Sequence, residues 1–323
     1  TIYIALFKKK YDVVFVHHTS PILIAFHPII YSLFNKSKKI LWDLDIWPET
    51  LQAVGLVKSS YIISTLEITV KWIYSKYDTI LISSKSLCNI VKERFNGKII
   101  YFPNWADRVI EDNKIDKNYS FAINTRKFNI VYTGNIGKSQ NFKSLLKTIE
   151  NVQENIHWTF VGDGRYKSEF KNLIESKNLN SKVSFIEQVN IDLIPSIVSK
   201  ADSLFLSLKR DPIFSKTVPA KLQSYLALRK PVIGVLQGEG AEIIKSSNCG
   251  IVEEKADYLA LANSVFMGKS LLREKENVAG QNPIEAAKLG CKIYHGPYTY
   301  NFRDVYEQFK SLGISKEINN EEL

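Results

Sequence analysis

The sequence predicts an α/β protein of two parallel-sheet domains joined by a linker, and three observations support this. Short apolar runs rich in β-branched residues alternate with amphipathic stretches of helical length, which is the pattern of repeated strand–helix units. Residues 111–128 are polar and rich in turn-forming residues, as expected of a connector. A chain of 323 residues is long enough to give each domain its own core.

Each element has its own local signal. Runs rich in β-branched residues predict a first series of strands at 12–16, 39–42, 79–83 and 98–102, and a second series at 129–133, 157–161, 183–186, 203–208 and 231–235. Helices are expected at 142–151, 166–178, 191–199 and 220–228. We therefore expect a first domain over 1–107, a linker over 108–128, a second domain over 129–263 and an additional βαβα segment over 264–323.

The composition excludes several classes of protein. With 45% hydrophobic and 24% charged residues, and no apolar run of membrane-spanning length, the chain is neither disordered nor an integral membrane protein. Three widely spaced cysteines form neither a zinc motif nor a disulfide framework, so we expect a reducing, cytoplasmic location. No signal peptide is visible. The chain begins at Thr1 inside an apolar segment, and we expect a truncated N-terminus.

The net charge of +10 and the isoelectric point of about 9.2 favour anionic partners, namely phosphates, nucleic acid or a membrane surface. An ordinary lysine-rich solvated surface is the alternative. Nucleic acid is excluded as a partner, because the sequence has no zinc spacing, no RNA-binding signature and no basic helix interleaved with aromatic residues.

Two glycine turns follow neighbouring strands of the second series. The first contains Gly134, Asn135 and Gly137, and the second contains Gly162, Asp163 and Gly164. Such turns leave backbone N–H groups free to face a phosphate, although neither turn has the dinucleotide or P-loop spacing. Because the carboxyl ends of parallel strands share one edge of the sheet, both turns are expected at one ligand crevice.

A cationic segment is expected at the edge of the same crevice. Lys209, Arg210 and Lys216 precede a helix whose first turn holds Lys221. A diphosphate suits such a site, whereas the alternative is a solvated loop. Lys221 is the stronger candidate, because the helix dipole disfavours a cation in the first turn and its presence there needs a reason.

Three stretches resemble family 4 glycosyltransferases of the two-domain GT-B type, in particular those that build bacterial O-antigen, capsule and colanic-acid-like polysaccharides. They are Asp45-Ile-Trp-Pro-Glu-Thr50, Phe102-Pro-Asn-Trp-Ala-Asp107, and the segment from Pro219-Ala-Lys221 to Lys230-Pro-Val-Ile233. The resemblance covers about residues 13–262. It implies a GT-B fold with two Rossmann-like domains facing a cleft, the first of them incomplete in this chain.

The resemblance also implies a reaction. A sugar would pass from a nucleotide-sugar, UDP- or GDP-linked rather than CMP-linked, to a lipid-linked or saccharide acceptor, with retention of configuration and without a metal or other cofactor. The enzyme would be peripheral on the inner face of the cytoplasmic membrane, with its basic surface on anionic lipid. The donor-binding residues would be Gly134, Asn135, Gly137, Gly162, Asp163, Gly164, Glu187, Lys216, Lys221 and Ser224.

The chain departs from the family pattern at several of these positions. Lys216 and Ser224 stand where many members carry a pair of glutamates, and Asn135 and Gln140 stand where an arginine and a lysine meet the diphosphate. Lys221 would supply the missing positive charge.

The catalytic candidates are Asp45 and Glu49, the carboxylates nearest a plausible acceptor site, and His17, which ends a predicted strand. The alternative to a catalytic role for Glu49 is a structural one, in which its carboxylate stabilises the first turn of a helix that begins after Pro48. For His17, the equal alternative is a hydrogen-bonded histidine at a strand end, and either His17 or His18 could be the one at the crevice.

The tail at about 264–323 resembles instead the end of the Kdo transferase of lipopolysaccharide synthesis. Gly280-Gln-Asn282-Pro-Ile-Glu285 and His295-Gly-Pro-Tyr-Thr-Tyr-Asn-Phe302 carry this likeness, in which Asn282 and Glu285 would take donor-site positions. A chimeric chain is therefore expected. Two alternatives stay open: transfer of Kdo from CMP-Kdo to a lipid A precursor, and an inactive nucleotide-sugar-binding module.

Overall fold

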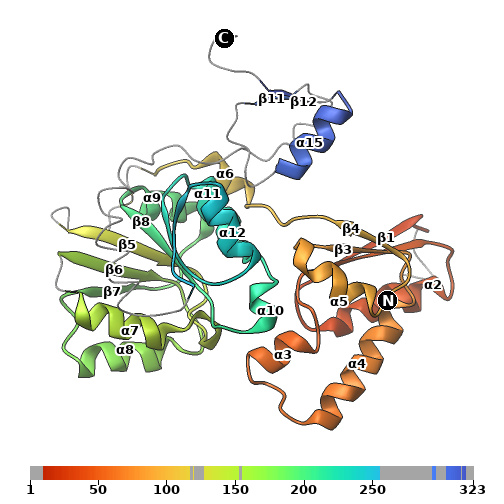
Figure 1. Ribbon diagram of the computed structural model, residues 1–323, viewed down its shortest axis with the longest axis horizontal. Coiled ribbons are helices and arrows are strands. Elements are labelled where there is room, and N and C mark those ends of the chain that lie inside the picture. The colour runs from red at the N-terminus through yellow and green to blue at the C-terminus, as the bar shows by residue number, and fades with distance from the viewer. Residues whose placement is uncertain are drawn as a thin grey trace. The chain divides into compact units, whose positions relative to one another are not determined.

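The computed structural model describes residues 10–116, 119, 127–152, 155–254, 293–295, 303–313 and 315–317. They form an α/β protein with two large parallel sheets, so the predicted fold class is confirmed (Figure 1). The chain divides into two compact units. The first contains residues 1–104 and 211–218, and the second contains 105–210 and 219–323.

The first unit contains a four-stranded sheet of order β1-β2-β3-β4, with all strand pairs parallel. Its core lies mainly under α4, whose Val70, Ile73 and Tyr74 are fully buried. The elements are β1 Val13–His18, η1 Ile22–Ala25, α2 Phe26–Ser32, β2 Lys38–Asp43, α3 Glu49–Ala53, α4 Ser60–Tyr74, β3 Thr79–Ile82, η2 Lys85–Leu87, α5 Cys88–Lys92, β4 Lys98–Tyr101 and α10 Pro212–Ser215.

The short helix α10 joins the first unit although it follows most of the second unit in sequence. It packs against α3, and its Ile213 is buried in the core of the first unit. The Ser84 hydroxyl also donates a hydrogen bond to the Lys216 carbonyl. We predicted a continuous domain over 129–263, whereas residues 211–218 of that range belong to the first unit.

The second unit contains a six-stranded parallel sheet of order β10-β9-β8-β5-β6-β7, the strand order of doubly wound nucleotide-binding domains. Its elements are α6 Arg108–Asp112, β5 Phe128–Thr133, η3 Lys138–Gln140, α7 Phe142–Asn151, β6 Ile156–Val161, α8 Lys167–Ser176, β7 Val183–Ile186, η4 Ile191–Leu193, α9 Ile194–Ser199, β8 Ser203–Ser207, α11 Ala220–Ala227, β9 Val232–Val235, α12 Glu239–Ser246, β10 Gly250–Val252, β11 Ile293–His295, α15 Arg303–Ser311 and β12 Ser315–Glu317.

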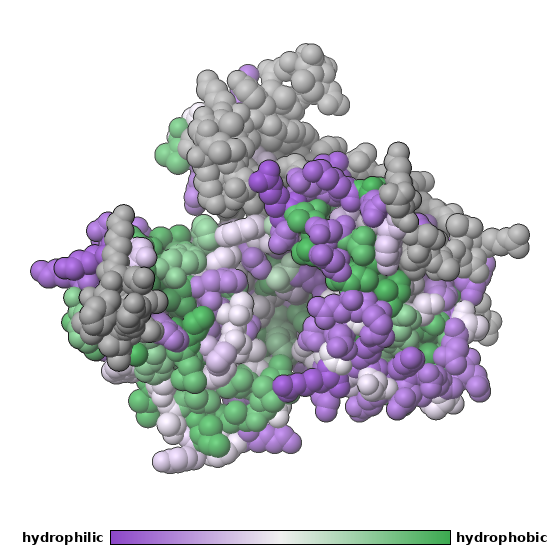
Figure 2. Space-filling model, turned by 180° about the vertical axis from the view of Figure 1, so that it is seen from behind, coloured by the Kyte–Doolittle hydropathy of each residue, from purple (hydrophilic) through white to green (hydrophobic). Residues whose placement is uncertain are grey.

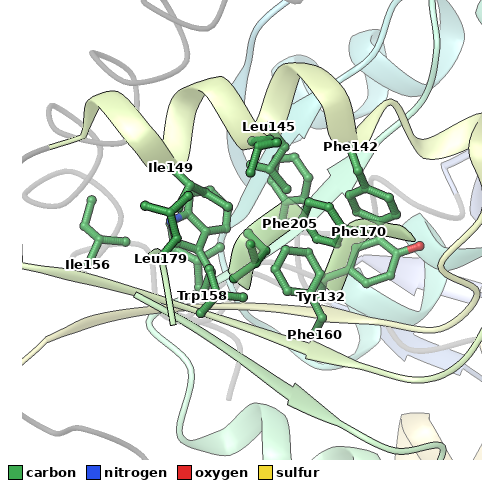
Figure 3. Packing of buried hydrophobic residues seen from close by; sticks show 14 of the residues in the cluster. Tyr132, Phe142, Leu145, Ile149, Ile156, Trp158, Phe160, Phe170, Leu179 and Phe205 are labelled. Atoms are coloured by element: carbon green, nitrogen blue, oxygen red, sulfur yellow. The ribbon is translucent and has the colours of Figure 1, made fainter. Parts of the chain in front are cut away.

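Helices cover both faces of this sheet, with α7 and α8 on one face and α9 and α11 on the other (Figure 1). Under α7 lies an aromatic core. Phe142 packs against Phe170 with ring centroids 5.0 Å apart, and meets Tyr132 and Phe160 edge to face at 5.2 and 5.6 Å (Figure 3). Such ring contacts stabilise the fold by more than the burial of their apolar area alone, and they hold α7 against strands β5 and β6.

Two segments differ in detail from our predictions. The expected linker over 108–128 begins with a helix, α6, because the Asp107 carboxylate caps the Val109 N–H at 3.0 Å and Ile110 is buried. This helix packs against α11 and η4 of the second unit. The helix expected at 191–199 is divided into η4 and α9, and Pro195 stands in the first turn of α9.

In the tail, the structure describes a parallel pair, β11 and β12, with α15 between them in sequence. Asn282 and Glu285 lie outside the described residues, so the likeness of the tail to a Kdo transferase stays a prediction. Within the described part of the chain, no helix is both long and apolar enough to cross a membrane.

Candidate functional site

A pocket of about 540 Å³ lies in the second unit, at the carboxyl ends of strands β5, β6 and β7. Five of the predicted donor-binding residues line it. Apolar and amide side chains that follow β7 complete the wall. The lining residues are Gly134, Asn135, Val161, Gly162, Asp163, Gly164, Gln188, Val189, Ile191 and Ile194.

The two predicted glycine turns are hydrogen-bonded to each other. The Gly134 N–H donates to the Val161 carbonyl at 2.8 Å, and the Ile136 N–H donates to the Asp163 carbonyl at 2.7 Å. Gly162 and Gly164 have φ angles of +135° and +154°, which favour glycine. A Cβ atom on Gly162 would lie 2.2 Å from the Gly134 carbonyl oxygen. The floor of the pocket therefore depends on this close approach of two backbones.

Lys221 lies beside the first turn. Its Cε and Nζ are 3.3 and 3.4 Å from the position that a Cβ atom on Gly134 would occupy. The ammonium stands 3.6 Å from the centroid of the Tyr132 ring, and burial lowers the pKa of Lys221 to about 7. Lys221 belongs to α11, which lies between β8 and β9 in sequence, and Gly134 follows β5. Strands β5 and β8 meet where the strand order reverses, which is where open α/β sheets bind ligands.

The other predicted binding residues lie outside the pocket wall. The Gly137 N–H donates a hydrogen bond to the Gln140 side chain at 3.0 Å. The exposed Glu187 carboxylate forms an ion pair with Lys167 at 2.6 Å. Ser224 is half-buried on α11. Lys216 falls in the segment that belongs to the first unit. We did not single out Val161, Ile191 or Ile194, which line the pocket, because apolar residues at strand and helix ends carry no chemical signal of their own.

The histidine pair at the end of β1 divides into one exposed and one buried side chain. His17 is exposed, and its ring contacts that of Trp42 at a tilt of 36°, with ring centroids 4.8 Å apart. His18 is fully buried, and its Nδ1 is 2.7 Å from the Asp43 carboxylate, which also accepts a hydrogen bond from the Tyr74 hydroxyl. The His18–Asp43–Tyr74 network was not predicted, since a buried polar network leaves no periodic pattern in a sequence.

Asp45 lies near this network. Burial, and less strongly the neighbouring Asp43 carboxylate, raise the pKa of Asp45 to about 6, while His18 opposes the rise. The native state therefore binds a proton at this carboxyl more tightly than the unfolded chain does, and the resulting stabilisation is lost as the pH rises through about 6.

Asp45→Asn is accordingly expected to raise the free energy of unfolding by about 1 kcal/mol at pH 8, because it removes a charge that burial disfavours. At pH 4 the variant and the parent protein should be equally stable, since both are then neutral at this position. Urea unfolding at the two pH values measures the difference. A loss of stability at pH 8 would contradict this view of Asp45.

Glu49 is held by Arg94, whose side chain is only 6% exposed. The Arg94 guanidinium donates to the Glu49 carboxylate, to the Glu67 carboxylate at 2.7 and 2.9 Å, and to the Trp47 carbonyl at 3.0 Å. Glu49 also stands in the first turn of α3. These contacts favour the structural alternative for Glu49.

We therefore expect Glu49→Gln to lower the free energy of unfolding by about 1–2 kcal/mol, because Arg94 loses one of two partly buried counter-charges. The rate of the transfer reaction that the resemblance implies, at a temperature well below unfolding, should change by less than about threefold, far below the hundredfold or more that a general acid–base contributes. Chemical unfolding and initial rates measure the two effects. A large loss of rate with unchanged stability would make Glu49 catalytic.

The family is decided by a comparison over the second unit. Residues 113–279 match the family model described as glycosyl transferases group 1, which is just over half of the chain. The chain belongs to this family. It is therefore a glycosyltransferase, which confirms the predicted class of enzyme. No curated protein sequence matches it.

Solved structures show the same fold at low sequence identity. The sucrose-phosphate synthase (tll1590) from Thermosynechococcus elongatus has a TM-score of 0.66 and 14% identity, over 96% of this chain and 76% of that one. Anabaena Alr3699/HepE in complex with UDP has a TM-score of 0.62 and 14% identity, over 93% of this chain and 79% of that one. WaaG, a glycosyltransferase involved in lipopolysaccharide biosynthesis, has a TM-score of 0.56 and 14% identity, over 79% of this chain and 78% of that one. The α/β fold with two parallel sheets thus matches that of GT-B glycosyltransferase structures, which confirms the predicted fold class.

Proposed function

We propose that this glycosyltransferase moves a sugar from a UDP- or GDP-linked donor to a lipid-linked or saccharide acceptor in bacterial cell-envelope polysaccharide synthesis. The transfer retains anomeric configuration and needs no metal. The single observation that carries the proposal is the pocket at the ends of β5, β6 and β7, with Lys221 beside its first glycine turn.

The pocket suits a nucleotide-sugar for physical reasons. Backbone N–H groups at the turns and the Lys221 ammonium can stabilise the negative charge that develops on a leaving diphosphate. Ile191 and Ile194 offer apolar contacts to a nucleobase or a ribose face. Alr3699/HepE has been solved with UDP and with UDP-glucose, which supports a uridine nucleotide as the first ligand to try.

The family 4 assignment, the envelope pathway and the membrane location belong to the same proposal. The motifs at 45–50, 102–107 and 219–233 support the first, and the lipopolysaccharide role of WaaG supports the second. The net charge of +10 supports peripheral binding to an anionic membrane surface, on the inner face of the cytoplasmic membrane.

A thermal-shift screen against UDP, GDP, CMP and their sugars tests the donor. A ligand that binds only the native state raises the melting temperature by mass action, so no acceptor is needed. We expect a shift with uridine or guanosine compounds. A shift with CMP compounds alone would favour the Kdo-transferase alternative, and no shift with any of them would contradict the proposal.

Turnover separates an enzyme from an inactive binding module. With a bound donor sugar and a lipid extract as acceptor, release of the nucleoside diphosphate is expected, and the product should keep the anomeric configuration of the donor. Activity should persist in excess chelator, because Lys221 and backbone donors replace a metal. Donor binding without any release of nucleotide would favour the binding module.

A further inference from the structure

Helix α4 of the first unit, Ser60–Tyr74, presents large apolar side chains to solvent. Tyr61 is 81% exposed, Ile68 is 69% exposed and Trp72 is 44% exposed. These residues are spaced along one stripe of the helix, while Val70 and Ile73 on the opposite stripe are buried in the core. The helix is thus apolar on both sides, and Tyr61 and Ile68 on its outer side are largely exposed to solvent.

The exposed stripe continues onto η1. Phe26, which follows η1, packs against Trp72 with ring centroids 5.6 Å apart, and η1 itself exposes Leu23 and Ile24. We call this surface the apolar face; its residues are Leu23, Ile24, Tyr61, Ile62, Ile68 and Trp72. Figure 2 shows apolar surface gathered over the part of the first unit that contains α4. Scattered single apolar residues need no explanation, whereas a contiguous set points to a binding partner.

The charges beside the apolar face are basic. Lys58 and Lys76 flank α4, and Lys71 is 52% exposed on it. Lys76 stands 5.5 Å from the centroid of the Trp72 ring. The one acid of α4, Glu67, is bound to Arg94 and is 3.5 Å from Lys71. Residues 1–104 contain 13 lysines and arginines against seven acids, which gives the first unit more than half of the net charge of the chain.

We propose that the apolar face docks on an anionic phospholipid bilayer, with α4 lying in the plane of the lipid headgroups. Aromatic and aliphatic side chains on one side of a helix, with lysines at its border, are the features of interfacial helices. Trp and Tyr rings are well suited to the headgroup level. This inference rests on the proposed function, because a lipid-linked acceptor would be reached from that surface.

Vesicle sedimentation of the purified full chain tests the inference without any nucleotide. We expect binding to vesicles of phosphatidylglycerol and phosphatidylcholine in equal parts, and little binding to phosphatidylcholine alone. Ile68→Ser with Trp72→Ser should lower the partition coefficient by about tenfold or more. Lys71→Gln with Lys76→Gln should lower it by about thirtyfold at low salt. All four side chains are exposed, so melting temperatures should stay within a few degrees of the parent value.

Matched controls come from the second unit. Leu312 is 70% exposed and Lys114 is 86% exposed, so Leu312→Ser and Lys114→Gln make changes of the same kind, one side chain at a time, in the other unit. Both should bind vesicles as the parent protein does. The nucleotide-induced thermal shift of each variant is measured in parallel, so that a failure of vesicle binding is distinct from a failure of the donor proposal.

Three outcomes would overturn the inference. One is equal vesicle binding by the parent and the Ile68→Ser/Trp72→Ser variant. Another is binding with no preference for anionic lipid. The third is a dimer in light scattering, without lipid, that this double variant dissociates, since the apolar face would then be an interface between two copies of the chain.

Discussion

Gly162→Ala should disrupt the second unit and abolish nucleotide binding. The new Cβ atom would lie 2.2 Å from the Gly134 carbonyl oxygen, and φ at this position is +135°. The obstacle is backbone, so no side chain can rotate to make room, and the two glycine turns must separate. We expect a loss of about 3 kcal/mol or more in the free energy of unfolding, since a clash and a strained φ combine.

Gly313→Ala is the control for backbone strain alone. Its φ is +69°, and a Cβ atom there would have nothing within 4 Å. This variant should lose only about 1 kcal/mol and should keep its nucleotide response. Urea unfolding and thermal shift with UDP compare the two. If Gly162→Ala were as stable as Gly313→Ala and still responded to UDP, the close contact of the two turns would not hold the pocket.

Lys221→Met is expected to have opposite effects on stability and on binding. Burial lowers the pKa of Lys221 to about 7, whereas a lysine in the unfolded chain titrates near 10.4. Between these values the unfolded chain binds the proton more tightly, so the buried amine destabilises the native state, fully so below pH 7. Methionine has a similar length and no charge. It should raise the free energy of unfolding by about 1–2 kcal/mol at pH 6, after the lost contact with the Tyr132 ring is counted.

The same variant should bind a nucleotide-sugar about tenfold to a hundredfold more weakly, because a charge-assisted contact to the diphosphate is removed. In the parent protein, affinity should fall as the pH rises above about 7, since the diphosphate binds the charged amine. In Lys221→Met this pH dependence should disappear. Melting curves with and without UDP-glucose from pH 6 to 9 measure all three effects. A variant that is less stable and binds as before would make Lys221 a structural residue.

The sheet of each unit was predictable because parallel strands leave a strong local signal. The central strand β5 is buried at all six positions, and its run of β-branched and aromatic residues marked it in the sequence. Helix α7 occurs at the predicted residues, since its apolar stripe and its polar stripe are sharply separated. The return of α10 to the first unit was not predictable, because a four-residue helix is fixed by one buried side chain, Ile213, and not by any periodic pattern.

The candidate site was predictable where glycine is required by geometry. Gly134, Gly162 and Gly164 were found because a turn after a strand leaves glycine in the sequence. The ion-pair partners of charged residues could not be predicted from the residue type alone. Glu49 and Glu187 are both acids near helices or strands, yet one is held by Arg94 and the other by Lys167. Which cation lies near which carboxylate depends on tertiary packing.

The most direct test of the account is isothermal titration of the full chain with UDP-glucose and with GDP-mannose at pH 7. Two buffers of different ionisation enthalpy report the protons exchanged on binding. We predict binding of one of the two donors with a net uptake of protons, because burial lowers the pKa of Lys221 to about 7 in the free protein and the diphosphate binds the charged amine. Lys221→Met should lose the uptake and most of the affinity. Absence of binding by both donors, or equal binding and proton uptake in the variant, would contradict the assignment of this pocket as the donor site.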